Sequence, residues 1–112
     1  MLTSGDVVAL DPGLPTGSEA GLRRAAIVVA AQQVLAGSPT VVQIVPVTRT
    51  LRGYESEVVI TADDHNGLTG DSAAQCQHIR AVATATVQDT IGNVGPTSLA
   101  QIRAILAVLL DL

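Results

Sequence analysis

Charged side chains gather in one glycine-rich stretch near the start of the chain, Gly17-Ser18-Glu19-Ala20-Gly21-Leu22-Arg23-Arg24. This stretch carries one carboxylate and two adjacent guanidinium groups, and it runs directly into the apolar segment Ala25–Ala31. That segment is rich in β-branched residues, which predicts a buried strand. The strand would fix where the loop ends, while the glycines let its backbone approach a ligand. We therefore expect the function to depend on Glu19 and Arg24, although such a pair can also be a solvated surface pair.

Further candidate residues follow two other predicted strands. Arg49, Thr50 and Arg52 come after the strand predicted at 40–48, and Gln77 and Arg80 lie on the strand predicted at 72–82. Arginine suits bidentate contacts with phosphate, and these polar side chains can read the edges of nucleobases. For Arg52 a solvated loop and for Arg80 a structural salt bridge remain alternatives. The formal net charge of −4 argues mildly against a nucleic-acid partner, but every basic residue is Arg, and a local positive site on an acidic body stays possible.

The elements that must position these residues are short strands followed by one helix. Strands are predicted at 5–10, 24–31, 40–48, 57–60, 72–82 and 91–94, with a turn or single helical turn at 32–37. Pro96 suits the first turn of a helix, and Ser98 with Gln101 resembles a capping box. The helix presents an apolar stripe formed by Leu99, Ile102, Leu106 and Leu109, widened by Ile105, Val108 and Leu112. This order predicts a small, mainly antiparallel, barrel-like sheet with a C-terminal helix.

Composition narrows the remaining possibilities. The 112 residues, 47% of them hydrophobic, predict one domain over 1–112 with an aliphatic core. A single thiol, Cys76, cannot form an internal disulfide, and we find no signal peptide or membrane-length apolar segment, so a cytoplasmic protein is expected. Asp63, Asp64, His65 and Asp71 lie among Asn and Gly, which favours a turn over a metal site. We expect no metal and no cofactor.

Together these stretches resemble the MazF/Kid family, the RNA-cleaving toxins of bacterial toxin–antitoxin pairs. The pieces of this resemblance keep the family's order along nearly the whole chain: Gly5-Asp6-Val7-Val8 with Asp11, Gly17-Ser18-Glu19, Arg23-Arg24, Pro46-Val47-Thr48, Gly53-Tyr54 with Glu57-Val58, Asp71-Ser72, and Gln77-His78-Ile79-Arg80. The chain departs from the family at Ala25, where proline is usual, and at Gln77-His78.

The resemblance implies an SH3-like antiparallel barrel with a C-terminal helix, a homodimer, and a cognate MazE-like antitoxin. It implies a metal-independent endoribonuclease in which Arg24, Thr48 and Glu19 are catalytic. RNA contacts are expected from Ser18, Arg23, Arg49, Thr50, Arg52, Gln77 and Arg80. Two alternatives stay open: a toxin-like scaffold that binds RNA or antitoxin without cleaving, and a gyrase poison of the same fold. The latter relies on a C-terminal Trp-Gly-Ile, whereas this chain ends Leu110-Asp111-Leu112.

Overall fold

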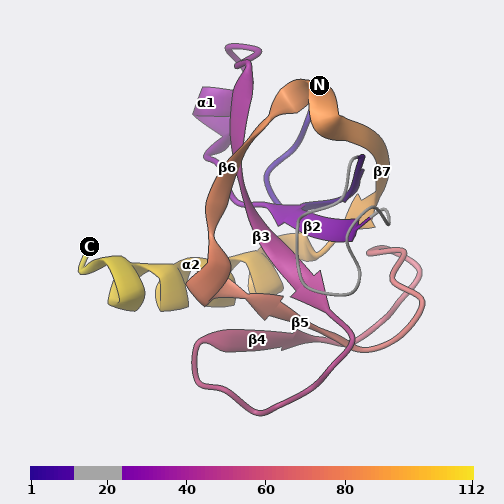
Figure 1. Ribbon diagram of the computed structural model, residues 1–112, viewed down its shortest axis with the longest axis vertical. Helices are drawn as coiled ribbons and strands as arrows, with labels where there is room; N and C mark the ends of the chain where they lie inside the picture. Colours follow the sequence, from indigo (N-terminus) through magenta and orange to yellow (C-terminus); the bar gives the residue numbers. More distant parts are fainter. Residues whose placement is uncertain (12–23) are drawn as a thin grey trace.

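A bent antiparallel sheet and one long helix form the described part of the protein, residues 1–11 and 24–112 of a computed structural model (Figure 1). Within this part, the strands are β1 (Asp6–Leu10), β2 (Arg24–Val28), β3 (Val41–Thr48), β4 (Glu57–Ile60), β5 (Ser72–Gln75), β6 (Arg80–Ala83) and β7 (Val87–Asn93). The helices are α1 (Gln32–Leu35) and α2 (Gly95–Leu110), with the 3-10 turns η2 (Cys76–His78) and η3 (Thr84–Thr86). The mainly antiparallel fold with a C-terminal helix is as predicted.

The sheet is open rather than closed into a barrel. Its hydrogen-bonded path runs β4-β5-β3-β2-β1-β7, and β6 pairs with β3 off this path. Among the described residues, β4 and β7 stand at the two ends of the path and do not pair with each other. The expectation of a barrel is therefore correct for the strand order and the bend of the sheet, and wrong for its closure. The last strand is also longer than the predicted 91–94.

The strand predicted at 72–82 is interrupted. β5 pairs Val47 with Ala74, whereas β6 pairs Ile44 with Arg80, so three residues along β3 correspond to six along the other chain segment. The three extra residues form η2, which buries Cys76. The sequence shows apolar and polar residues interleaved throughout this stretch, so the alternation of a strand hides the turn.

Alternation along the strands divides the core into two apolar clusters, one on each face of the sheet. The first cluster, which α2 covers through Ile102 and Leu106, contains Val7, Ile27, Val29, Val45, Val47, Val58, Ile60, Ala74 and Cys76. The second lies on the opposite face and contains Val8, Leu10, Ala26, Val28, Ala30, Leu35, Val42 and Ile44. Odd-numbered positions of β1, β2 and β3 face α2, and even-numbered positions face away from it.

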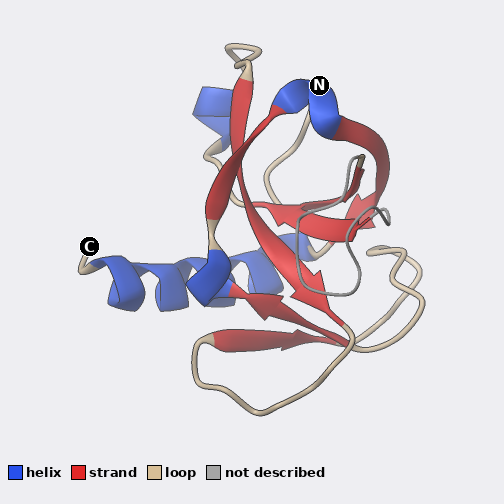
Figure 2. Cartoon of the chain, in the orientation of Figure 1, coloured by secondary structure: helices blue, strands red, loops and turns tan. Residues whose placement is uncertain are grey.

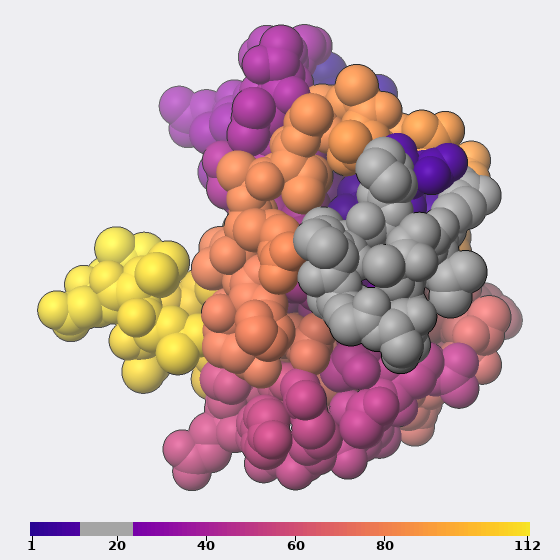
Figure 3. Space-filling view, in the orientation of Figure 1, coloured from indigo at the N-terminus to yellow at the C-terminus, as the bar shows by residue number. Residues whose placement is uncertain are grey.

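The helix α2 packs on the sheet through residues as far as Leu106, and its C-terminal end projects from the body (Figures 2 and 3). Leu99, Ile102 and Leu106 are buried as predicted, but Val108 is 79% exposed and Leu112 is 89% exposed. The predicted capping box is wrong: no side chain caps the helix, Ser98 lies inside it, and Gly95 N–H donates to Asn93 Oδ1 (2.8 Å) just before it. Within the described residues no helix is both long and apolar enough to cross a membrane.

Candidate functional site

Arg24 and Thr48 lie at the same edge of the sheet on neighbouring strands. β2 begins at Arg24, and β3, its antiparallel partner, ends at Thr48. The pairing of these two strands reaches Ala26 and Pro46, and Arg24 and Thr48 each lie two residues beyond that pair, at the same end of the two strands. Residues two apart on a strand share a face, and the even-numbered positions of β2 and β3 face away from α2, so both side chains belong to that face. Both residues are half-buried.

The hydroxyl of Thr48 is oriented by its own loop. Thr50 N–H donates to Thr48 Oγ1 at 3.1 Å, directly after the strand ends. A hydroxyl that accepts a hydrogen bond still has its own proton to donate. Thr48 can therefore donate to an anionic oxygen, and Thr50 takes part by holding that hydroxyl through its backbone.

The side chain of Arg49 contacts the turn that precedes β5. Its Nη1 donates to Thr69 Oγ1 (3.0 Å), and its guanidinium lies so close over Gly70 that a Cβ at Gly70 would come within 2.1 Å of Arg49 Nη2. The missing side chain of Gly70 therefore makes room for this arginine at the strand-three end.

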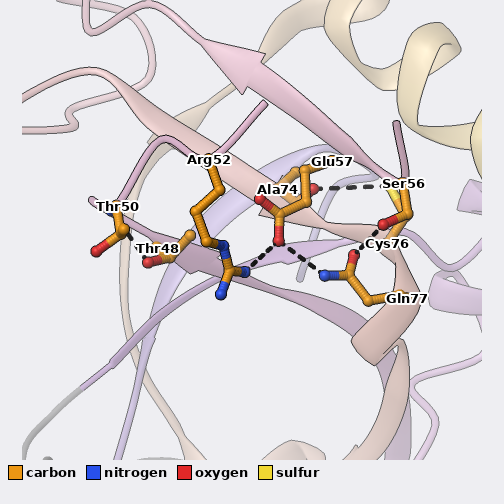
Figure 4. A network of polar contacts seen from close by, with 8 residues as sticks. All are labelled: Thr48, Thr50, Arg52, Ser56, Glu57, Ala74, Cys76 and Gln77. Carbon is orange, nitrogen blue, oxygen red and sulfur yellow. Dashed lines mark hydrogen bonds and ion pairs between the residues drawn. The ribbon is translucent and has the colours of Figure 1, made fainter. Parts of the chain in front are cut away.

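Arg52 belongs to a buried polar cluster centred on Glu57 (Figure 4). The guanidinium of Arg52 pairs with Glu57 Oε2 and stacks 4.5 Å from the ring centroid of Tyr54. Gln77 Nε2 donates to the same carboxylate oxygen (2.7 Å), and Ser56 Oγ donates to Gln77 Oε1 (3.0 Å). The Arg52 side chain is 35% exposed, but that of Glu57 is only 2% exposed. The structure thus joins two predicted RNA contacts, Arg52 and Gln77, through one buried anion.

The ionisation of Glu57 is held by its partners. Burial raises the pKa of this carboxyl, but hydrogen bonds from Gln77 and Arg52, together with the positive charge of Arg52, outweigh burial and leave the pKa below its ordinary value. Glu57 Oε1 is buried and has no hydrogen-bond partner among the described residues. The hydrogen bonds from Arg52 and Gln77 both meet Oε2.

The pairing of β5 places this cluster on the same face as Thr48. Thr48 pairs with Ala73, and Glu57 pairs with Gln75, two residues further along β5. Residues two apart on a strand share a face, so Thr48, Gln75 and Glu57 all point away from α2, with about 12 Å between the Cα atoms of Thr48 and Glu57. Arg80 joins the same face through its pairing with Ile44, and its Nε donates to His78 O at 3.4 Å.

Three predicted site residues, Ser18, Glu19 and Arg23, lie outside the described residues. The remaining seven divide into an edge pair, Arg24 with Thr48, and residues grouped around the strand ends next to it, Arg49, Thr50, Arg52, Gln77 and Arg80. The sheet thus places two of the three predicted catalytic residues, Arg24 and Thr48, at the same end of neighbouring strands.

Two other places carry no comparable chemistry. Asp63 and Asn66 form the predicted turn, because Asp63 Oδ1 accepts the N–H groups of His65 and Asn66 (both 2.8 Å). In the described part of the chain no metal-binding group of His, Cys, Asp and Glu is found. A hollow of about 400 Å³ at the N-terminal end of the sheet is lined by Met1, Leu2, Leu35, Ser38, Pro39, Thr84, Val87 and Thr90, none of them a predicted site residue.

Sequence reasoning missed the role of Glu57 and Ser56. Glu57 opens a short strand whose other three residues, Val58, Val59 and Ile60, are all apolar, so no alternating pattern marks its carboxylate as buried. One signal in the sequence could have indicated its role. Glu57 follows a loop that contains Arg52, and a carboxylate needs a cationic partner of this kind if it is buried.

Comparison with known proteins gives matches along nearly the whole chain. Residues 3–110 match the family described as PemK-like, MazF-like toxin of type II toxin–antitoxin system. A Mycobacterium tuberculosis protein named endoribonuclease MazF9 is 33% identical over 117 aligned positions, which cover 100% of this chain and 98% of that protein. These matches confirm the resemblance seen in the sequence.

Solved structures agree. MazF from Deinococcus radiodurans has a TM-score of 0.78 at 27% identity, covering 99% of this chain and 97% of its own. The MazE–MazF structure from the same organism has a TM-score of 0.76 at 27% identity, covering 99% and 96%. The described architecture is therefore shared with these proteins along their whole length.

Proposed function

We propose that this chain, which belongs to the family of PemK-like, MazF-like toxins of type II toxin–antitoxin systems, is a sequence-specific endoribonuclease that cleaves single-stranded RNA without a metal ion. The observation that supports the proposal is that Arg24 begins one strand and Thr48 ends its antiparallel neighbour, so both lie at the same end of adjacent strands. A guanidinium beside a hydroxyl can hold two oxygens of one phosphate.

In the proposed reaction the ribose 2′-oxygen attacks the neighbouring phosphorus. A base takes the proton of that 2′-OH, the P–O5′ bond breaks, and an acid gives a proton to the departing 5′ oxygen, so the products are a 2′,3′-cyclic phosphate and a 5′-OH. The guanidinium of Arg24 stabilises the charge that grows on the phosphoryl oxygens, while the hydroxyl of Thr48 donates a hydrogen bond to one of them. We assign the base to Glu19, a carboxylate that is ionised at pH 7 by its reference pKa of about 4.3.

The test is cleavage of a randomised single-stranded RNA pool by the purified chain in excess chelator, followed by sequencing of the new 5′ ends. We expect one short word to be cut in chelator. Arg24→Ala should lower the rate by about 10²–10³-fold, and Thr48→Val, which keeps the shape but removes the hydroxyl, by a smaller factor. Arg103→Ala is the matched control, because Arg103 is exposed on α2, which covers the opposite face, and should leave the rate unchanged.

Intact RNA in the presence of a folded wild-type chain would favour the non-cleaving scaffold instead. If Arg24→Ala still cleaves RNA at the wild-type rate, the chain is an endoribonuclease but Arg24 is not its catalytic residue.

We also propose a homodimer and a cognate antitoxin as partners, in a cytoplasmic setting. A solved structure from Deinococcus radiodurans that resembles this chain is of MazE–MazF, which supports a cognate antitoxin as a partner. The exposed apolar end of α2 supports the dimer, because Val108, Leu109, Leu110 and Leu112 are all exposed there. The two core clusters draw on residues from Val7 to Leu106, which supports the whole chain as a single domain.

A further inference from the structure

The loop between β3 and β4, residues 49–56, packs little apolar surface against the rest of the chain. Residues 49–55 are all exposed, and Leu51, the aliphatic side chain of the loop, is 50% exposed. A loop of this kind is held by its polar contacts, because burial of apolar groups contributes little to its position. Its position matters to the candidate site, since the loop begins directly after Thr48.

Hydrogen bonds hold the two ends of this loop. At its start, Arg49 Nη1 donates to Thr69 Oγ1 (3.0 Å). At its end, Glu57 N–H donates to Tyr54 O (3.1 Å). Neither contact reaches the middle of the loop, which therefore needs a contact of its own.

The side chain of Arg52 ties the middle of the loop to the sheet. Its guanidinium reaches from the loop to Glu57 Oε2 and stacks on the ring of Tyr54, 4.5 Å from the ring centroid (Figure 4). The carboxylate of Glu57 is buried on β4 and also accepts Gln77 Nε2 (2.7 Å), so it is a fixed acceptor for Arg52.

This ion pair lies close in sequence to the contact that orients the hydroxyl of Thr48. Thr50 N–H donates to Thr48 Oγ1 (3.1 Å), and Arg52 follows Thr50 by two residues. A movement of Thr50 by about 1 Å away from Thr48 would break this bond, because N–H···O bonds have lengths of about 2.7–3.2 Å. Without it, the Thr48 side chain could turn to its other staggered χ1 rotamers.

We propose that Arg52 is a positioning residue, whose ion pair with Glu57 holds the 49–56 loop so that Thr50 keeps the Thr48 hydroxyl in the orientation used in cleavage. This inference rests on the proposed endoribonuclease activity. It gives Arg52 a role in the loop in place of a contact with an RNA phosphate, because the carboxylate of Glu57 already neutralises the charge of Arg52.

A double-mutant cycle on cleavage tests whether Arg52 acts through Thr48. The substrate is a short single-stranded RNA with the word found in the randomised pool, cut in a single turnover with the protein in excess. Arg52→Ala should lower the maximal rate by about 5- to 50-fold, and by no more than Thr48→Val does, because a misplacement of about 1 Å can cost about 10²-fold. In the Thr48→Val background the same change should cost less than about twofold, because the hydroxyl that Arg52 positions is already absent.

Binding separates a positioning role from a contact with phosphate. The probe is the same RNA with a 2′-deoxyribose at the cleavage position, which lacks the attacking oxygen. Arg52→Ala should change its affinity by less than about twofold and keep the wild-type salt dependence, whereas a lost phosphate contact would reduce the slope by about 0.7. Arg103→Ala is the matched control, because it removes an exposed guanidinium on α2, and it should leave both rate and affinity unchanged.

The fold of the variant needs a second arm, because Arg52→Ala leaves Glu57 buried without its cation. If Arg52→Ala does not fold, Arg52→Met combined with Glu57→Gln takes its place in the cycle, since this pair of changes removes both charges together. An equal loss of rate in the two Thr48 backgrounds would overturn the inference. A reduced salt slope, or a wild-type rate in Arg52→Ala, would do the same.

If wild type cuts no RNA, the proposed function fails, and the positioning role is then measured in the free protein. The three-bond NMR couplings of the Thr48 methyl group report its χ1 angle. Wild type and Arg103→Ala should show one χ1 rotamer, and Arg52→Ala should show an average over several. A single, unchanged rotamer in Arg52→Ala rejects the positioning role whatever the RNA result.

Discussion

Glu57 connects the polar face of the sheet with the core beneath it. Its carboxylate holds Arg52 and Gln77 on one side, and the next residue of β4, Val58, packs in the cluster that α2 covers. Cys76 belongs to that same cluster and is fully buried. One negative charge therefore acts both on the predicted RNA contacts and on the nearest ionisable group of the core.

The thiol of Cys76 should make the stability depend on alkaline pH. Burial, with a smaller contribution from the negative charge of Glu57, raises the pKa of Cys76 from 9.0 to about 11. Between these values the unfolded chain loses this proton and the folded chain keeps it, so stability is complete below about pH 9 and falls as the pH rises to about 11. The loss should be on the order of 2–3 kcal/mol.

Urea unfolding at pH 8 and at pH 10.5 checks this for wild type and Cys76→Ala. The variant should be less stable at both pH values because it leaves a cavity, but it should lose less stability between them. All other ionisable groups are common to both chains, so their contribution to the pH dependence of stability cancels in the comparison. Equal losses in the two chains would rule out the thiol as the source.

The sequence indicated the residues at the strand ends better than the polar cluster around Glu57. The positions of Arg24 and Thr48 at strand ends could be predicted, because each stands where an apolar strand meets a polar loop, which is visible in the residue pattern. Glu57 and Ser56 could not, because their importance comes from the approach of η2 to the start of β4, a contact between segments about twenty residues apart. Hydrogen bonds between segments this far apart do not change the local pattern of apolar and polar residues.

At the scale of elements, the strand positions could be predicted where Pro or Asp lies near one end of an apolar run: Asp11 follows β1, Pro39 precedes β3, and Asp63 follows β4. The break at η2 could not be predicted, because it serves the change of pairing along β3 rather than any local preference. The start of α2 shows the same limit, since Asn93, a residue of β7, bonds the Gly95 N–H in place of the expected capping box.

The turn at 63–67 supports β7 through backbone contact at Gly92. Asn93 N–H donates to His65 O (2.9 Å), and a Cβ at Gly92 would lie 2.4 Å from the same oxygen and 2.5 Å from the Asn66 carbonyl carbon. These are backbone atoms, so neither can turn aside. Gly92→Ala should therefore lower the free energy of unfolding by about 1–3 kcal/mol, the usual cost of overpacking.

Gly37→Ala is the matched control for this glycine. A Cβ at Gly37 would meet only Val34 O, at 3.4 Å, so the change should stay within about 0.5 kcal/mol. Chemical unfolding of both variants gives the comparison. Equal stability of Gly92→Ala and wild type would mean that the turn moves easily and does not support the strand.

At the scale of the whole molecule, the described chain leaves an apolar surface at the end of α2. Val108 is 79% exposed and Leu110 is 51% exposed, and a groove of about 550 Å³ separates this end of the helix from Tyr54, Glu55 and Ser56. A helix that is apolar on all sides is stable in water when another surface covers it. The proposed homodimer supplies that surface from a second copy of the same chain.

Val108→Asp should then weaken the dimer by about tenfold or more, because each copy would bury one charge in place of an apolar side chain worth about 1.5–3 kcal/mol. Arg103→Asp introduces a carboxylate at an exposed position of the same helix, five residues earlier and on another side of the helix, and should leave the association unchanged. Sedimentation equilibrium across a range of concentrations measures both. The apolar end of α2 is the dimer contact only if the two variants separate: identical masses at every concentration would place the interface elsewhere on the molecule, and monomers throughout, wild type included, would remove the homodimer.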